Sequence, residues 1–212
     1  MPNVRNAIRW VATSLVLGVI AFSAIGCAAA GLIAHATTPP PKVPPAYKLA
    51  PVPTILLVDF SGNPGQGTLD SIRIAALATG MMRDNGLTFM LDPGLATSAQ
   101  SSQPLDKRLR PSELARACGA KQFIYIDLRR YTTTSSMLGE TASGQAEAAV
   151  WVVDAQTAEV LWPPESGQGF PIGASVPFTP TTGGTTEQLV HDQINQQIAQ
   201  KSGRLFFEWQ EQ

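Results

Sequence analysis

The chain has 212 residues, of which 15 are lysine or arginine and 16 are aspartate or glutamate. This length supports one medium-sized domain with a hydrophobic core and excludes two large ones. A net charge of −1 excludes a strongly basic nucleic-acid binder. Two cysteines and two histidines leave few ligands for a zinc or iron–sulfur site. We therefore expect no nucleic-acid partner and no metal or other cofactor.

A long apolar segment comes first in the chain. Residues 10–33 carry no charge and follow Arg5 and Arg9. A run of this length can span a bilayer as a helix, with the arginines on the cytoplasmic side. Two alternatives stay open: Cys27 follows Ala-Ile-Gly in a pattern similar to a lipobox and would then be lipidated, or the chain is cleaved after residue 36. All three predict that residues 1–36 are a signal or anchor segment.

A proline-rich segment follows the apolar one. Residues 37–53 contain seven prolines in 17 positions. Because proline fixes φ and removes an amide donor, such a segment is typical of an extended polyproline spacer. We predict a linker over residues 37–53 that holds the exported domain, residues 54–212, on the periplasmic side of the membrane.

The pattern of apolar residues in the exported domain predicts alternating strands and helices. The continuous apolar run at 54–60 predicts a buried strand, and the periodicity at 69–85 predicts a helix. Further strands are predicted at 87–91, 122–128, 145–154 and 159–162, further helices at 111–117 and 185–209, and irregular connections at 92–105, 133–144 and 163–184. This order predicts an α/β (α+β) fold in which helices pack on a mixed β-sheet, preceded by the apolar helix and the proline-rich tether.

Three short patterns resemble a known family. They are L-V-D-F-S-G-N at 57–63, C-G-A-K-Q-F-I-Y at 118–125, and V-V-D-A-Q-T-A-E-V-L-W at 152–162, where Ala158 replaces the usual glycine. The chain resembles the envelope α/β family that includes the curli-secretion channel lipoprotein, the lipoprotein activators of penicillin-binding proteins and the N-terminal domain of the Tol–Pal β-propeller protein. The resemblance implies a periplasmic scaffold, activator or channel subunit, mostly without chemistry of its own. The connection at 133–144 is too short for two membrane-spanning strands, so the resemblance does not imply a pore.

The search for catalytic chemistry finds isolated residues rather than a motif. Asp59 and Asp127 lie near the ends of two predicted strands and could act as an acid–base pair, although helix capping or loop hydrogen bonding explains them more simply. The glycine-rich loop at 62–67 lacks the lysine of a phosphate-binding loop and predicts a turn. His191 is expected to be solvated or to cap a helix, and Cys118 to be a small buried residue. We therefore expect a non-enzymatic protein with no catalytic, cofactor-binding or metal-ligating residue.

A local basic cluster and three tryptophans complete the candidates. The cluster is interpreted either as a solvated helix face or as a docking patch for an acidic partner or an anionic polymer. The tryptophans are expected in the core rather than stacked on a sugar ring. The basic residues are Lys107, Arg108, Arg110 and Arg116, and the tryptophans are Trp151, Trp162 and Trp209.

Together these features predict a membrane-tethered envelope protein whose non-catalytic α/β domain binds a partner protein or scaffolds an assembly. Such a protein could form homo-oligomers. One alternative is a subunit of an oligomeric secretion channel or ring, which the resemblance favours. The other is an envelope hydrolase without a recognisable motif.

Overall fold

The computed structural model describes residues 41–60, 69–104, 107–135, 141–164, 167–180 and 186–210. The predicted signal or anchor segment, including Cys27, and the glycine-rich loop lie outside these residues. Residues 43–209 form one compact unit. The two-residue strands β1 (Lys42–Val43) and β7 (Trp209–Gln210) each have one residue inside this range. Within the described ranges, no helix combines the length and the apolar character needed to cross a bilayer.

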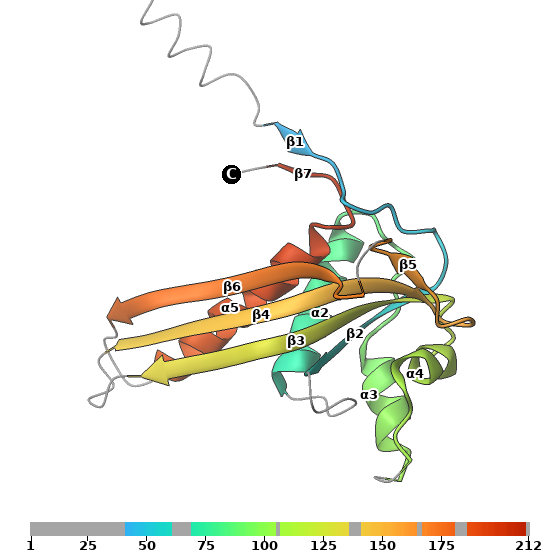
Figure 1. Ribbon diagram of the computed structural model, residues 1–212, viewed down its shortest axis with the longest axis horizontal. Helices are drawn as coiled ribbons and strands as arrows, with labels where there is room; N and C mark the ends of the chain where they lie inside the picture. Colours follow the sequence, from blue (N-terminus) through green and yellow to red (C-terminus); the bar gives the residue numbers. More distant parts are fainter. Residues whose placement is uncertain are drawn as a thin grey trace, which may run out of the picture. The chain divides into compact units, whose positions relative to one another are not determined.

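A mixed five-stranded sheet forms the centre of this unit (Figure 1). β2 (Thr54–Phe60) pairs in parallel with β3 (Gln122–Ser135), and β3 pairs antiparallel with β4 (Thr141–Asp154). β5 (Val160–Trp162) and β6 (Phe170–Pro180) both pair antiparallel with β4, along different parts of that strand. The predicted fold class, α/β with helices packed on a mixed sheet, is therefore confirmed.

Helices cover both faces of the sheet. α2 (Leu69–Asp84) and α5 (Thr186–Gly203) pack against each other and on one face, as Figure 1 shows. α3 (Gly94–Ser101) and α4 (Pro111–Ala117) pack on the other face, near β2 and β3. β2 is buried on both faces, which explains its continuous apolar sequence. The first core includes Leu56, Ile74, Met82, Ile126, Ile194 and Ile198, and the second includes Ile55, Leu57, Ala96, Ala115 and Phe123.

Two segments between α2 and α4 differ from the predictions. The strand predicted at 87–91 is reduced to a single parallel bridge between Thr54 and Met90. The loop predicted at 92–105 contains α3 instead. Asp92 Oδ1 accepts a hydrogen bond from the Gly94 N–H at 2.8 Å, and Pro93 with its fixed φ favours the start of a helix.

Two predicted connections are strands. The residues at 133–144 extend β3 to Ser135 and begin β4 at Thr141, and the segment at 163–184 contains β6. Gly144 shows why the sequence hides this arrangement, because a Cβ atom there would lie 2.3 Å from Ile194 Cδ1 and 2.7 Å from Val190 Cγ1. The glycine thus allows α5 to approach β4 closely, and it does not mark a loop.

Part of the predicted linker packs on the compact unit. The Tyr47 N–H donates to the Leu205 carbonyl oxygen at 3.0 Å, and the Tyr47 ring lies 5.9 Å from the Trp162 ring. Leu49 is buried in the first core. The segment from residue 43 to 53 is therefore part of the compact unit rather than a free spacer.

The turn between β4 and β5 places Ala158 in a left-handed conformation, with φ of 60°. Asp154 Oδ1 accepts hydrogen bonds from the N–H groups of Gln156 and Thr157 at 2.7 and 2.9 Å. The Thr157 and Gln156 donors hold the pKa of Asp154 below its usual value. The Ala158 N–H donates to the Asp154 carbonyl oxygen at 2.9 Å. This is the position at which the sequence has alanine where the resembled family has glycine.

Replacing Ala158 with glycine is expected to stabilise the protein. A left-handed L-residue costs about 1–2 kcal/mol, and the extra chain entropy of glycine offsets part of that, so we expect a net gain of about 0.5–1 kcal/mol. Urea unfolding of the full chain measures the change. Ala155 in the same turn is fully buried and serves as the control, because its replacement by glycine should destabilise. A destabilising Ala158→Gly would contradict the assignment of strain to this residue.

Candidate functional site

A groove lies between α2, β2, α3 and α4, and we call it the α2–α3 groove. Its volume of about 740 Å³ lies within the range of roughly 300–1,000 Å³ that is typical of ligand sites. Most of its lining is small or apolar, and Asp59, Gln100 and Arg108 are among its polar members. Its apolar walls include Ile72, Ala75 and Ala76 of α2 and Ala96 and Leu114 of α3 and α4.

One side of the groove is the free edge of β2. At the start of this edge the Thr54 N–H donates to the Phe89 carbonyl at 3.1 Å, and the Thr54 carbonyl accepts from the Leu91 N–H at 2.7 Å. In a parallel strand, the N–H and carbonyl groups of one residue point to the same side, and this side alternates from residue to residue. Like those of Thr54, the main-chain groups of Leu56 and Val58 therefore point to the free edge. Both residues line the groove, and within the described part of the chain no hydrogen bond reaches these edge groups.

Gln100 on α3 brings an unpaired amide to the groove. Its Nε2 and Oε1 atoms are both buried, and neither has a hydrogen-bond partner among the described residues. A buried polar group without a partner costs about 1–3 kcal/mol. Because both atoms are buried, a ligand that offers a donor and an acceptor would remove this cost once the Gln100 side chain turned toward the groove.

Asp59 and Asp127, predicted at the ends of neighbouring strands, are direct register partners in β2 and β3. Asp59 is 8% exposed and accepts a hydrogen bond from the Tyr125 hydroxyl, while Asp127 Oδ2 lies 3.6 Å from Arg129 Nε. Burial, followed by the charges of Asp59 and Asp127, raises the pKa of Tyr125 above its usual value. The partners of these carboxylates include side chains of β3, and the expected helix-capping or loop hydrogen bonds stay a prediction.

The four residues of the predicted basic patch separate in the structure. Arg108 is half-buried and lines the α2–α3 groove. Lys107, Arg110 and Arg116 are exposed and do not line it. The Arg110 N–H donates to Glu113 Oε2 at 2.9 Å at the start of α4. Arg108 is thus the member of the patch that could contact a ligand in the groove.

The tryptophans and Cys118 lie close to their predicted positions. Trp162 is buried in the first core, whereas Trp151 and Trp209 are half-buried against the two cores. The Arg129 guanidinium lies 5.7 Å from the Trp151 ring and Arg204 lies 4.2 Å from the Trp209 ring. Cys118 is half-buried, and burial raises the pKa of its thiol, which disfavours a reactive thiolate.

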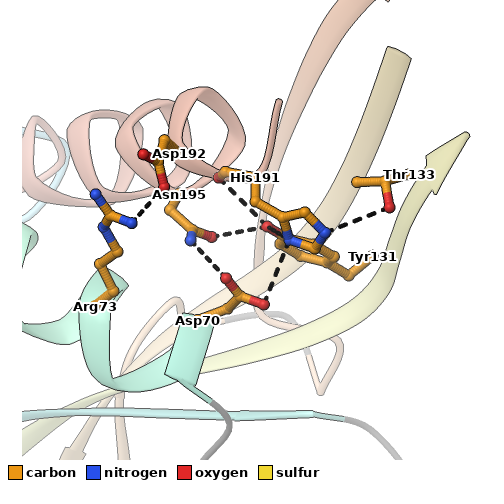
Figure 2. Close-up of polar contacts among 7 residues, drawn as sticks. All are labelled: Asp70, Arg73, Tyr131, Thr133, His191, Asp192 and Asn195. Carbon is orange, nitrogen blue, oxygen red and sulfur yellow. Dashed lines mark hydrogen bonds and ion pairs between the residues drawn. The ribbon is translucent and has the colours of Figure 1, made fainter. Parts of the chain in front are cut away.

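A second group of polar residues joins α2, β3 and α5 on the opposite face of the sheet (Figure 2). His191 Nδ1 lies 3.0 Å from the Tyr131 hydroxyl and 3.6 Å from Asp70 Oδ2, and His191 Nε2 lies 3.4 Å from Thr133 Oγ1. Asn195 is fully buried, donates to Asp70 Oδ1 at 2.7 Å, and accepts from the Tyr131 hydroxyl at 3.0 Å.

This polar network holds the two large helices together. Burial, followed by the charges of Asp70 and Asp192, raises the pKa of Tyr131, so its hydroxyl stays protonated as a donor. The ion pair between Arg73 and Asp192 adds a second link between α2 and α5. His191 belongs to this network, whereas we expected a solvated or capping residue. None of these residues lines the α2–α3 groove, so the network does not act on a ligand there.

Sequence reasoning missed Gln100, Tyr131 and Asn195. The sequence predicts a loop over the segment that holds Gln100, although Asp92 followed by Pro93 is a pattern that often begins a helix. The other two residues pair across more than 60 positions, which no local pattern reports. Within the described ranges, no three histidine, cysteine, aspartate or glutamate side chains gather as a metal site would require.

No family model and no curated protein sequence matches this chain. Similar solved structures include the PelC dodecamer from Paraburkholderia phytofirmans, with 11% identity over 79% of this chain and 96% of that chain, and a TM-score of 0.42. Lipoprotein GNA1162 from Neisseria meningitidis matches with 18% identity over 68% of this chain and 93% of that one, at 0.36. The LpoB C-terminal domain from Salmonella enterica matches with 16% identity over 59% and 83%, at 0.31. At these TM-scores the likenesses carry no argument about function.

Replacing Gln100 with leucine is expected to raise the free energy of unfolding by about 1 kcal/mol, because the substitution removes a buried amide that has no partner. Urea unfolding of the full chain without added ligand measures this change. Gln103 also lines the groove, but it has no buried unpaired atom, so its replacement by leucine should not stabilise. A loss of stability in Gln100→Leu would show that the amide is paired in solution.

Replacing Asn195 with alanine is expected to lower the free energy of unfolding by about 2 kcal/mol, since it removes a partner from both Asp70 and the Tyr131 hydroxyl. Thermal or urea unfolding measures the loss. Gln193 is exposed on the same helix, and its replacement by alanine should change stability by less than about 0.5 kcal/mol. Equal effects of the two substitutions would contradict the structural role of the network.

Proposed function

We propose that this chain is a membrane-tethered, non-catalytic envelope protein whose compact unit binds a partner protein in the α2–α3 groove. The apolar segment at 10–33 and the preceding arginines support the tether, as either a spanning helix or a lipoprotein signal with Cys27. The proposal places the compact unit on the exported, periplasmic side.

The groove is the observation that carries this proposal. It has a volume of about 740 Å³ and exposes apolar surface to solvent. Exposed apolar patches on a folded domain mark interaction sites. Ile72 of α2 is 42% exposed and lines the groove. Covering such residues with a partner would bury apolar area and so favour association.

The chemistry of the lining supports binding rather than catalysis. The described lining contains Asp59, Asp92 and Arg108 as charged residues and includes no histidine, cysteine or lysine. Its hydroxyl groups, such as that of Thr97, therefore have no imidazole within the groove to activate them. His191 could serve as a base elsewhere, but it lies in the network on the opposite face of the sheet.

A photo-crosslinking residue in the groove is expected to capture one partner protein in native membranes. Thr97 and Ser98 are exposed neighbours on α3, and Thr97 lines the groove whereas Ser98 does not. Benzoylphenylalanine at position 97 of the full chain should give a discrete adduct of higher mass, and the same residue at position 98 should give little. Mass spectrometry of the adduct identifies the protein captured.

A groove-filling variant provides the control for this experiment. Ala76 is exposed and lines the groove, so Ala76→Trp should abolish the adduct at position 97. Ala117 is exposed on α4 outside the groove, so Ala117→Trp should leave the adduct in place. An adduct that survives Ala76→Trp, or equal adducts at positions 97 and 98, would overturn the proposal.

A further inference from the structure

We propose that the α2–α3 groove binds an extended peptide segment of the partner protein, which adds a strand to the free edge of β2. This inference rests on the proposed function and specifies the chemistry of its partner. Strand addition supplies affinity through main-chain hydrogen bonds and specificity through pockets for alternate side chains.

The β6 edge and the β2 edge of the sheet differ in how their main-chain groups are hydrogen-bonded. At the β6 edge, the Gln197 side chain accepts from the Ser175 N–H and donates to the Ser175 carbonyl, both at 3.3 Å. Lys201 Nζ donates to the Gly173 carbonyl on the same edge. Proteins commonly cover edges in this way because exposed edges recruit other strands. The edge at Leu56 and Val58 has no such hydrogen-bonded cover among the described residues and lies in a groove, where Leu56 is 1% and Val58 8% exposed.

The chain itself begins a strand on the β2 edge and then leaves it. The segment around Met90 pairs with Thr54 through two main-chain hydrogen bonds, in the parallel sense. Asp92 and Pro93 then turn the chain into α3, which forms the far wall of the groove. A peptide in the groove would continue the pairing along the same edge, to the N–H and carbonyl groups of Leu56 and Val58.

Gln100 supplies an independent observation that points to a peptide. Its buried amide lacks partners for both its donor and its acceptor. A peptide group offers one carbonyl and one N–H, which are the complementary acceptor and donor. A purely hydrocarbon ligand would leave the Gln100 amide unpaired and would also leave the β2 edge unpaired.

The walls of the groove specify the side chains of the peptide. One wall is α2, with Ile72 and Ala75, and the opposite wall is α3 and α4, with Ala96 and Leu114. An added strand would thus be enclosed on both faces, as β2 is. Strands buried on both faces are continuously apolar rather than alternating, so we expect an uncharged apolar core of several residues in the partner segment.

A peptide whose own backbone can form hydrogen bonds along only one side tests this inference. The probe is a capped hexapeptide, Lys-Val-Ala-Val-Ala-Lys, with N-methyl groups on alternate residues so that it cannot self-associate into sheets. The control peptide is N-methylated at every residue and keeps the side chains but loses the donors. Binding to the full chain in mild detergent is measured by fluorescence polarisation, and amide exchange is measured residue by residue by NMR.

Strand addition predicts a specific pattern of protection. Saturation with the probe should slow exchange of the Leu56 and Val58 amides by about tenfold or more, since an edge amide without a hydrogen bond gains one. The amides of Ile55 and Leu57 already bond to β3, so their exchange should change little. The fully methylated control should bind at least about tenfold more weakly.

Substitutions in and outside the groove distinguish binding in the groove from non-specific binding. Gln100→Leu should lower the affinity for the probe several-fold, although we expect the same substitution to stabilise the free protein. A purely structural role of Gln100 would not give this combination. Ala76→Trp should abolish binding, and Ala117→Trp should leave it unchanged.

Three outcomes would overturn the inference. Binding of the probe without protection of Leu56 and Val58 would mean that the groove uses side chains alone. Failure to bind the probe, with the crosslink at position 97 intact, would mean that the partner is not an extended peptide, and the proposed function would stand. Protection of these amides that grows with protein concentration, with a native mass of two chains, would assign the edge to a second copy. If the otherwise unchanged chain gave no adduct at position 97, the proposed function itself would be rejected.

Discussion

The parallel pairing of β2 with β3 determines where the helices and the groove lie. It runs in continuous register from Thr54 opposite Gln122 to Phe60 opposite Leu128. Parallel neighbours require a long crossover, and here the crossover carries α2, α3 and α4. Those helices return to opposite faces of the sheet, so β2 is enclosed on both sides while its outer edge stays between them. The α2–α3 groove is therefore a direct consequence of the crossover, and its open edge is part of the same geometry.

The walls of the groove owe their positions to packing and to one polar network. On one face, the Asn195 amide and the Tyr131 hydroxyl connect to Asp70 at the beginning of α2, and the ion pair between Arg73 and Asp192 adds a further link. These contacts hold α2 against α5. A groove wall fixed in advance lowers the entropy cost of binding, because little ordering is left for the moment of association.

The sheet also separates the residues that could perform acid–base chemistry. Asp59 and Asp127 lie on the face that carries α3 and α4, and His191 lies on the face that carries α2 and α5. Each of these groups has partners within the described structure, such as Tyr125 and Tyr131. This separation, together with a groove that offers an open strand edge and an unpaired amide, favours recognition of a polypeptide over catalysis as the role we propose.

Local periodicity and capping residues were enough to predict the strand at 54–60, the helices near 69–84 and 111–117, the β4–β5 hairpin and the α/β class. The sequence also predicted that the strands carrying Asp59 and Asp127 are neighbours, although Asp127 does not end its strand because β3 continues to Ser135. It did not determine α3, β6 or the extensions of β3 and β4, since weakly patterned segments take their structure from partners distant in the chain. The unpaired edge at Leu56 and Val58 and the unpaired amide of Gln100 become visible only in the folded chain. Whether a backbone or side-chain group finds a partner depends on every element packed around it, which no local pattern encodes.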